Sequence, residues 1–359
     1  MQCVLRRGAF GRPLRSRWLH GPLVLGTVRQ RERLLERIEQ PLGGDRLGTQ
    51  SGSRDAADGI YVEIRIHGDL DELWRRTQDP DLHKRWDLRF SEITYLPRAG
   101  EHVPQQFDYR TRIGFGLRID GKGESTGNRS SPNGARTSAL SFWSEDSKSL
   151  IREGSGYWRY VPTENGIRFL TWYDYRTRFG WLGRVIDKVV FRPLIGWATA
   201  WSFDRLRLWI ERGIDPANAM RQAAACAVAR LAVALVFIYE GLVPKLLYHH
   251  ATELALLLAS GIPAVDAPGV LTAVGIAEIV LGVLVLVRWT WRWPLIVTIA
   301  LMIAALIDVS LTAPAALTSA FNPITLNAAT AALAAIALMS GNDVPSASRC
   351  LRTPPSRLS

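Results

Sequence analysis

The sequence predicts two folds in one chain: an α+β domain with a curved antiparallel sheet closed by a helix, then an all-α bundle of four transmembrane helices. Three observations carry this prediction. Short segments between residues 60 and 178 alternate apolar and polar side chains, as half-buried strands do. Four long apolar segments follow between Ala223 and Ser340. Those 118 residues contain only four Lys or Arg side chains.

The apolar segments are long enough to cross a bilayer, since a membrane-spanning helix needs ~20 residues. They are Ala224–Val243, Val270–Val287, Pro294–Thr312 and Ile324–Met339. Residues 1–223 carry 37 Lys or Arg and 27 Asp or Glu, whereas residues 224–341 carry 4 and 5. The basic excess therefore lies outside the spans, where it indicates contact with anionic lipid rather than with nucleic acid. Lys and Arg residues cluster before the first span, between the second and third spans, and after the fourth span. Because cytoplasmic loops carry an excess of Lys and Arg, these clusters predict that both termini lie in the cytoplasm.

Three carboxylates lie inside the predicted spans: Glu240, Glu278 and Asp308. Each costs ~2.5–3.5 kcal/mol at the centre of a span, so such residues usually face a bundle interior or a watery cavity. Glu240 and Asp308 lie near span ends, and contact with lipid headgroups is an equal alternative for them. Glu278 has no such alternative, because it lies in the middle of the second span.

The polar neighbours of Glu278 follow from helical spacing. Gly275, Glu278 and Gly282 share one helix face, where small residues let a neighbouring helix approach. Arg230 is the only cation well inside a span, and we expect it to pair with Glu278. Asn327, early in the last span, is expected to hydrogen-bond across the bundle. The alternative for these polar residues is a structural role that only fixes the register of the helices.

The predicted strands are separated by turn residues such as Pro132-Asn133-Gly134 and Glu164-Asn165-Gly166. They are Ile60–His67, Glu92–Leu96, Gln105–Ile113, Leu117–Glu124, Ala135–Trp143, Ser149–Val161 and Gly166–Arg178. Two short helices follow the first strand, the second opening at Asp79-Pro80-Asp81. The closing helix comes from Trp181–Glu211 and is broken or bent at Pro193.

The tryptophans of the closing segment allow two interpretations. Most are expected to pack against the sheet. Trp181 and the basic, apolar run Gly183–Arg192 have a second interpretation, because Trp beside Arg and Lys suits the headgroup region of a membrane.

The order of elements in residues 59–213 resembles the SRPBCC superfamily, the START-like helix-grip fold that includes polyketide cyclases and lipid-transfer proteins. The residues that carry the resemblance are Leu73-Trp74, Asp79-Pro80-Asp81, Trp86, the Ile93–Leu96 strand and the Trp201–Ile210 helix. The resemblance implies a deep apolar cavity between sheet and closing helix. Some relatives are enzymes and many are not.

Aromatic residues are the candidates to line that cavity: Trp86, Tyr95, Tyr109, Trp143, Tyr157, Trp158, Trp172 and Tyr173. The alternative for each Tyr is core or rim packing rather than acid catalysis. No HExxH, P-loop or helix-opening GxGxxG motif is present. The three Cys are far apart without a CxxC, so we expect neither a disulfide framework nor a metal site. Catalytic residues are therefore unknown.

The membrane half is similar to the DoxX-like family of small four-span bacterial membrane proteins, and the match covers all four spans. The matching residues are Arg230, Tyr239–Leu247, Glu253-Leu254, Gly275–Glu278, Gly282 and Asn322–Asn327. The resemblance implies a four-helix bundle in the bacterial cytoplasmic (inner) membrane. It also implies, through the founding members, a link to quinone-dependent redox chemistry.

These observations divide the chain into an Arg-rich, disordered extension (1–58), the SRPBCC-like domain (59–213), a linker (214–222), the DoxX-like bundle (223–341) and a disordered tail (342–359). We expect a non-enzymatic module whose cytoplasmic cavity holds a lipid- or isoprenoid-like ligand beside the bundle. No cofactor is then required. The alternative is a quinone-linked or proton-coupled membrane enzyme that uses Glu278. The sequence does not indicate the oligomeric state.

Overall fold

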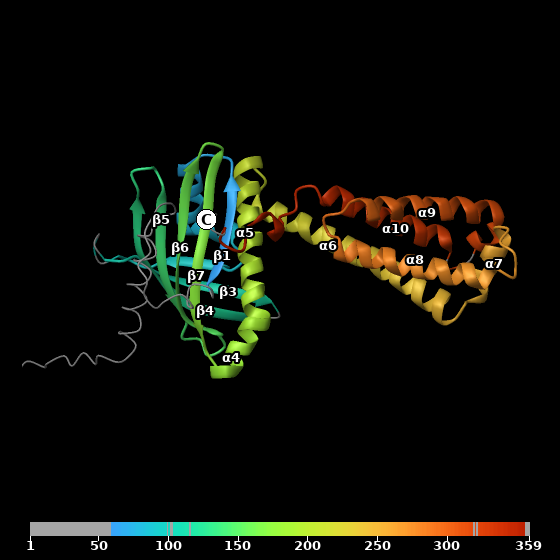
Figure 1. Ribbon diagram of the computed structural model, residues 1–359, viewed down its shortest axis with the longest axis horizontal. Helices are drawn as coiled ribbons and strands as arrows, with labels where there is room; N and C mark the ends of the chain where they lie inside the picture. Colours follow the sequence, from blue (N-terminus) through green and yellow to red (C-terminus); the bar gives the residue numbers. More distant parts are fainter. Residues whose placement is uncertain are drawn as a thin grey trace, which may run out of the picture.

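The computed structural model describes residues 59–98, 100, 103–114, 116–318, 320 and 322–355. A β-rich domain and an elongated helical bundle follow one another along the long axis of the molecule (Figure 1). The predicted Arg-rich extension, residues 1–58, lies outside the described residues.

The β-rich domain is built on a seven-stranded antiparallel sheet in the order β1-β7-β6-β5-β4-β3-β2. Its strands are β1 (Ile60–Ile66), β2 (Glu92–Tyr95), β3 (Gln106–Gly114), β4 (Leu117–Ser130), β5 (Arg136–Trp143), β6 (Ile151–Thr163) and β7 (Gly166–Thr177). All seven predicted strands are confirmed. Each strand from β2 to β6 pairs antiparallel with the next strand in the sequence, whereas β1 crosses the domain to pair with β7. That crossing leaves β1 and β2 at opposite edges of the sheet.

Two short helices fill the connection between β1 and β2. They are α2 (Leu70–Gln78) and α3 (Pro80–Trp86). The Asp69 carboxylate accepts from Glu72 N at 2.8 Å, and the Asp79 carboxylate accepts from Asp81 N at 2.8 Å, so an Asp caps each helix. The Asp79 cap starts α3 where the sequence predicts it.

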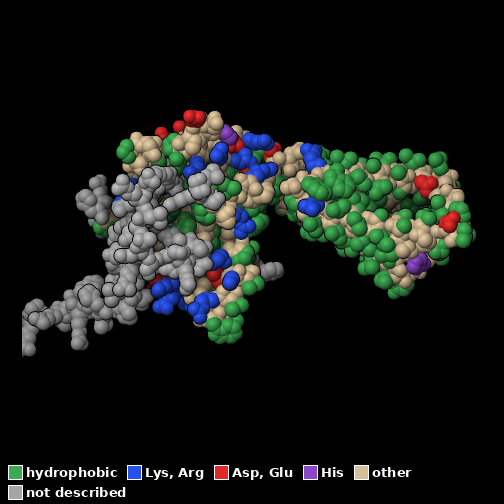
Figure 2. Space-filling model, viewed as in Figure 1, with side chains coloured by type: hydrophobic (Ala, Val, Ile, Leu, Met, Phe, Trp, Pro, Cys, Tyr) green, Lys and Arg blue, Asp and Glu red, His purple; other side chains and the backbone are tan. Residues whose placement is uncertain are grey.

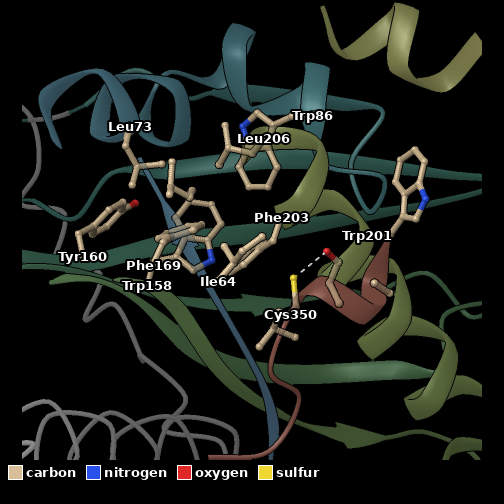
Figure 3. Close-up of a cluster of buried hydrophobic side chains, with 14 of the residues drawn as sticks. Ile64, Leu73, Trp86, Trp158, Tyr160, Phe169, Trp201, Phe203, Leu206 and Cys350 are labelled. Carbon is tan, nitrogen blue, oxygen red and sulfur yellow. Dashed lines mark hydrogen bonds between the residues drawn. The ribbon is translucent and has the colours of Figure 1, made fainter. Parts of the chain in front are cut away.

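The closing helix forms in three pieces: α4 (Gly180–Ile186), a π-helical turn η1 (Asp187–Phe191) and α5 (Arg192–Arg212). Pro193 lies in the first turn of α5, directly after the π-helical turn η1, so the predicted break or bend at this residue takes the form of a change in helix type. The Phe203 ring of α5 stacks on Phe169 of the sheet at 4.4 Å between centroids (Figure 3). Sheet and closing helix thus form the predicted helix-grip arrangement.

The bundle contains four helical segments long and apolar enough to cross a membrane: Pro216–Leu247, Ala267–Val287, Trp293–Thr312 and Pro323–Ser340. They correspond to α6 (Pro216–Glu240) with the π-helix η2 (Gly241–Leu247), α8 (Ala267–Val287), α9 (Trp293–Thr312) and α10 (Pro323–Ser340). A short helix α7 (Ala251–Ala259) lies between the first two. Helix α6 contacts α8 and α10, and α9 packs on α10.

The predicted linker and the predicted end of the first span are both corrected. Helix α6 begins at Pro216, where Asp215 accepts from Ala217 N at 2.8 Å, so most of residues 214–222 are helical. The helical path also continues past Gly241 to Leu247. Pro244 offers no N–H to the carbonyl of Glu240, and a π-helical turn absorbs that lost bond.

The predicted disordered tail is wrong for residues 342–355. Glu63 of edge strand β1 and Leu351 exchange two backbone hydrogen bonds of 2.9 Å. Ala347 and Cys350 are buried in the core of the β-rich domain (Figure 3). Arg349 binds the buried Asp204 carboxylate of α5 at 2.7 Å. The tail is ordered because the edge of β1 and this carboxylate supply partners that composition does not reveal.

Candidate functional site

A cavity of about 350 Å³ lies between the curved sheet and α5. This volume falls within the range of small-molecule sites. Helix α5 and the preceding turn contribute Phe191, Leu194, Ile195 and Ala198. Aromatic and aliphatic side chains from the sheet complete most of the wall, among them Ile93, Phe107, Ile119, Leu140, Phe142 and Trp158. The cavity predicted from the resemblance is therefore present.

Several predicted lining residues do contribute to the wall, among them Tyr95 and Tyr109. Burial raises the pKa of Tyr109 to about 12. Tyr157 also borders the cavity, while its ring stacks on Trp172 at 6.2 Å. Trp158 and Tyr173 line it too. Burial raises the pKa of Tyr95 and Tyr173 as well.

Three predicted lining residues, Trp86, Trp143 and Trp172, do not line the cavity. Phe142 and Tyr173 do line it, and successive strand residues point to opposite faces, so their neighbours Trp143 and Trp172 face away. Trp86 is fully buried in the core, where its indole N–H donates to Arg76 O at 2.9 Å. The alternation of each strand was the signal that would have excluded two of these tryptophans.

Residues that follow α3 supply a polar group at the cavity that sequence reasoning missed. Arg89 donates to both oxygens of Asp87, at 2.9 and 2.6 Å, and His83 Nε2 lies 3.0 Å from Asp87 Oδ2. Burial favours a raised pKa for the Asp87 carboxyl, but Arg89 and His83 outweigh it and hold that pKa well below its usual range. Arg89 and His83 line the cavity, whereas Asp87 lies behind them.

A second polar group gathers at the end of α2. The Tyr160 hydroxyl lies 2.7 Å from Thr77 Oγ1 and accepts from Gln78 Nε2 at 3.1 Å. Ser138 donates to Gln78 Oε1 at 3.1 Å, and Tyr95 donates to the Gln78 carbonyl at 2.9 Å. The apolar cavity thus has two separate sets of polar side chains in its wall.

Among the described residues, no nucleophile is paired with a general base in the wall of this cavity. The hydrogen bond of His83 is with Asp87, and no hydroxyl or thiol bonds to His83 among the described residues. A GxSxG spacing does occur at Gly123–Gly127, but it lies within β4 and not on the strand-to-helix turn of a hydrolase. Within the described part of the chain no three His, Cys, Asp or Glu side chains gather as a metal site would require.

The bundle holds a second candidate site around Lys245, which is buried in η2. Its Nζ lies 3.1 Å from Glu278 Oε2 of α8 and 3.4 Å from Glu253 Oε2 of α7. It also donates to the Glu240 carbonyl at 3.5 Å. The predicted partner of Glu278 was Arg230, and this is wrong: Lys245 takes that place because η2 turns its side chain inward.

Arg230 instead binds the end of helix α8. It donates to the carbonyls of Val285, at 2.9 Å, and Trp291, at 3.1 Å, and its guanidinium lies 5.2 Å from the centre of the Trp289 ring. A cation at the C-terminal end of a helix is favourable because the exposed carbonyls there carry partial negative charge. Arg230 therefore stabilises the end of the bundle next to the β-rich domain.

Of the other predicted intramembrane residues, Asp308 and Asn327 are not part of the Lys245 site. Asp308 accepts from Ser260 Oγ at 2.6 Å and lies on an exposed part of α9. Asn327 is half-buried and forms no hydrogen bond to another helix among the described residues, so its predicted bond across the bundle is absent. Glu240 contributes its carbonyl to the site.

The close approach of α6 and α8 holds the Lys245 site together. A side chain at Gly275 would place its Cβ 2.8 Å from Gly241 O and 2.9 Å from Lys245 Cβ. At Gly282 a Cβ would lie 2.9 Å from Ile238. The prediction that these glycines admit a neighbouring helix beside Glu278 is confirmed.

Sequence comparison assigns the membrane half. The profile of the DoxX-like family matches residues 234–335. Over 183 residues the chain is 51% identical to the "uncharacterized membrane protein YndG" of Bacillus subtilis, which covers 51% of this chain and 68% of that protein. The chain belongs to the YndG family. It is a membrane protein with a DoxX-like C-terminal domain.

Solved structures resemble the β-rich domain of this YndG-family protein. The STAR-related lipid transfer protein of Xanthomonas axonopodis is 18% identical (TM-score 0.32) and covers 43% of this chain and 86% of its own. The Zhui aromatase/cyclase of Streptomyces sp. R1128 is 10% identical (TM-score 0.33), covering 43% and 96%. The hypothetical protein jhp0584 of Helicobacter pylori is 15% identical (TM-score 0.37), covering 48% and 99%. The helix-grip assignment depends on the strand order and the closing helix, not on these scores.

Proposed function

We propose that this protein is a membrane-anchored binding module. Its cavity holds a lipid- or isoprenoid-like molecule and exchanges it with the membrane beside the bundle. The observation that carries this proposal is the mostly apolar cavity of about 350 Å³ in a domain joined directly to a membrane span. Apolar walls with a few fixed polar groups are typical of small-molecule sites.

The polar groups of the cavity indicate the chemistry of the ligand. Arg89 and His83 offer N–H groups at one place in the wall, and Gln78, Ser138 and Tyr95 surround another. Polar groups at two fixed places in an otherwise apolar wall favour a ligand with oxygen atoms on a hydrocarbon body. A lipid, or an isoprenoid with an oxygenated end, has this composition.

The attachment of the domain favours transfer to the same membrane. Gly213–Asp215 separate α5 from α6, and the ordered tail returns from α10 to β1. Two connections restrict the domain to the bilayer surface, where a short tether gives a high effective concentration. A ligand that leaves the cavity therefore meets this membrane first.

Native mass spectrometry of the full-length protein, purified in mild detergent, tests the proposal. We expect a retained apolar molecule in the wild type. Ala198→Phe should remove most of it, because the larger side chain enters the cavity. Ala217→Phe, at an exposed position of α6, is the matched control. Equal retention by both variants, or no retained molecule across expression hosts, would contradict the proposal.

The orientation that we propose has both termini in the cytoplasm of a bacterial cell. Lys and Arg side chains gather at the end of the bundle next to the β-rich domain, while acidic ones lie near its far end (Figure 2). A membrane-impermeant maleimide should label Val265→Cys in intact cells but Glu164→Cys only after permeabilisation. The reverse pattern would overturn this orientation.

A second candidate function is quinone-linked redox or proton-coupled chemistry at Glu278. It is favoured by the Lys245 site, where one buried cation meets the carboxylates of Glu253 and Glu278. Infrared titration of the protein in bilayers should show a carboxyl band that Glu278→Gln abolishes and Asp308→Asn leaves in place. If Glu278→Gln removes no titrating band and leaves the cellular phenotype unchanged, proton handling at this residue fails.

A further inference from the structure

An apolar surface lies on α4 and η1, at the N-terminal end of α5, and is exposed to solvent. We name it the α4–η1 surface. Its apolar members are Phe179, Trp181, Leu182, Val185, Ile186, Val189 and Val190, with Trp181 70% and Val189 69% exposed. So many large apolar side chains on consecutive turns are unusual on a soluble surface and mark a site of contact.

A buried carboxylate holds this surface in place. Asp187 accepts from the Tyr175 hydroxyl at 2.6 Å and from Arg192 Nε at 3.0 Å. Between Phe179 and Val190 only Gly183 and Asp187 are buried, so the segment is anchored from beneath while its apolar side chains point outward. The apolar side chains of the α4–η1 surface are therefore exposed on a segment whose backbone is held in place.

The charges of the α4–η1 surface are all positive. Arg184 and Lys188 are exposed and form no ion pair with any residue that the structure describes, while the one acid of the segment, Asp187, is turned inward. Trp and aliphatic residues interleaved with unpaired cations match the interface of an anionic bilayer, where phosphates meet hydrocarbon. A protein partner would need acidic groups around an apolar groove to match this pattern.

The bundle places a bilayer within reach of this surface. Helix α5 runs across the long axis of the bundle, with α4 at its lower end (Figure 1). Hydrophobic and basic side chains lie together at that end of the domain (Figure 2). A bilayer crossed by the bundle lies across the same axis, so the 21 residues of α5 run parallel to the plane of that bilayer for ~31 Å.

We propose that the α4–η1 surface inserts into the anionic headgroup region of the membrane that the bundle spans. Phe191 and Leu194, which follow directly, line the cavity, and Leu194 is 56% exposed. Docking therefore sets one wall of the cavity against lipid. The docking does not depend on which ligand the cavity holds, so it can succeed or fail separately from the proposed function.

Quenching in proteoliposomes tests the docking. Full-length protein with Cys3 replaced by Ser carries a fluorophore at Val189→Cys, and the bilayer contains lipids with bromine on the acyl chains. We expect strong quenching with phosphatidylglycerol present and weak quenching in phosphatidylcholine alone. Glu164→Cys, in the turn at the other end of β7, is the matched site and should stay unquenched.

Charge reversal separates lipid contact from other occupants. Arg184→Glu with Lys188→Glu should reduce the quenching at position 189 several-fold, whereas Arg65→Glu with Lys122→Glu, at exposed positions of the sheet, should not. Equal quenching at positions 189 and 164 would overturn the inference. So would protection of position 189 that depends on protein concentration, because a second copy would then be the occupant.

Discussion

At the residue scale, one buried charge in each domain, Asp87 and Lys245, has partners that lie close in sequence or on a neighbouring helix. Asp87 binds Arg89, two residues further on, and His83, one helical turn before it. Lys245 binds Glu278 across the α6–α8 contact. Removing one member of such a pair leaves an uncompensated charge in a low-dielectric place, which costs more than the pair itself contributes.

The Asp87 pair predicts an acid-sensitive step in the stability of the β-rich domain. The pKa of Asp87 is lower in the folded state than the ~3.9 of an unfolded chain. The charged Asp87 carboxylate therefore stabilises the folded state in full above about pH 4, and this contribution to the free energy of unfolding is lost as the pH falls further. Asp87→Asn should cost about 3 kcal/mol at pH 7, because Arg89 loses its charged partner.

Chemical unfolding of the two proteins between pH 7 and pH 3 measures this difference. The gap in unfolding free energy should narrow below about pH 4, where wild-type Asp87 begins to lose its charge on unfolding. Asp71→Asn is the control, since Asp71 pairs with Arg136 but is 77% exposed, and it should change stability by less than ~1 kcal/mol. A gap that does not depend on pH would contradict the role given to Asp87.

At the scale of elements, the contact between α6 and α8 decides whether the Lys245 site exists. Gly241 and Gly275 face each other so closely that either helix would have to move if a side chain were added. Pro244 and the π-helix η2 then turn Lys245 toward Glu278. The close contact of the two backbones and the π-helical turn η2 act together here. Neither would bring the charges of Lys245 and Glu278 together alone.

Two glycines of α8 give a matched test of this contact. Gly275→Ala should destabilise the bundle by ~1–3 kcal/mol, because the new Cβ meets backbone and side-chain atoms of η2. Gly269 has no heavy atom of another element within 4 Å of the corresponding position, so Gly269→Ala should be neutral or slightly stabilising. Thermal unfolding in detergent measures both. Similar melting temperatures for the two variants would show that the approach is not tight.

At the scale of the whole molecule, the tail makes the two domains depend on each other. It leaves the bundle near Arg292, which donates to Asn342 at 2.9 Å, and an ion pair joins Asp343 to Arg212 at the end of α5. It then covers the edge of β1 and buries Ala347 and Cys350. An exposed sheet edge is a site for unwanted pairing, and the tail protects it.

Deletion of residues 344–355 should therefore destabilise the β-rich domain, although every deleted residue follows the bundle in sequence. We expect a loss of ~2–4 kcal/mol from the emptied core and from the bonds that Asp204 loses to Ser346 N and Arg349, although its ion pair with Arg207 remains. Hydrogen exchange should show faster exchange at Glu63 N, which loses its bond to Leu351 O. Deletion of only residues 356–359 is the control. If both deletions leave Glu63 equally protected, the tail does not stabilise the domain.

The sequence by itself determined the elements and their order. Local side-chain alternation set the seven strands, Asp caps set α2 and α3, and long apolar segments set the four spans, because each signal acts over a few neighbouring residues. The paired glycines beside Glu278 were also predictable, since helical spacing alone puts Gly275 and Gly282 on one face.

The tertiary structure alone decided which side chains meet. Lys245 rather than Arg230 pairs with Glu278 because a π-helical turn, set by Pro244, redirects one side chain. The tail is ordered because a free strand edge and the Asp204 carboxylate lie where it leaves α10. These partners are distant in sequence, and their pairing depends on packing geometry that no local pattern records.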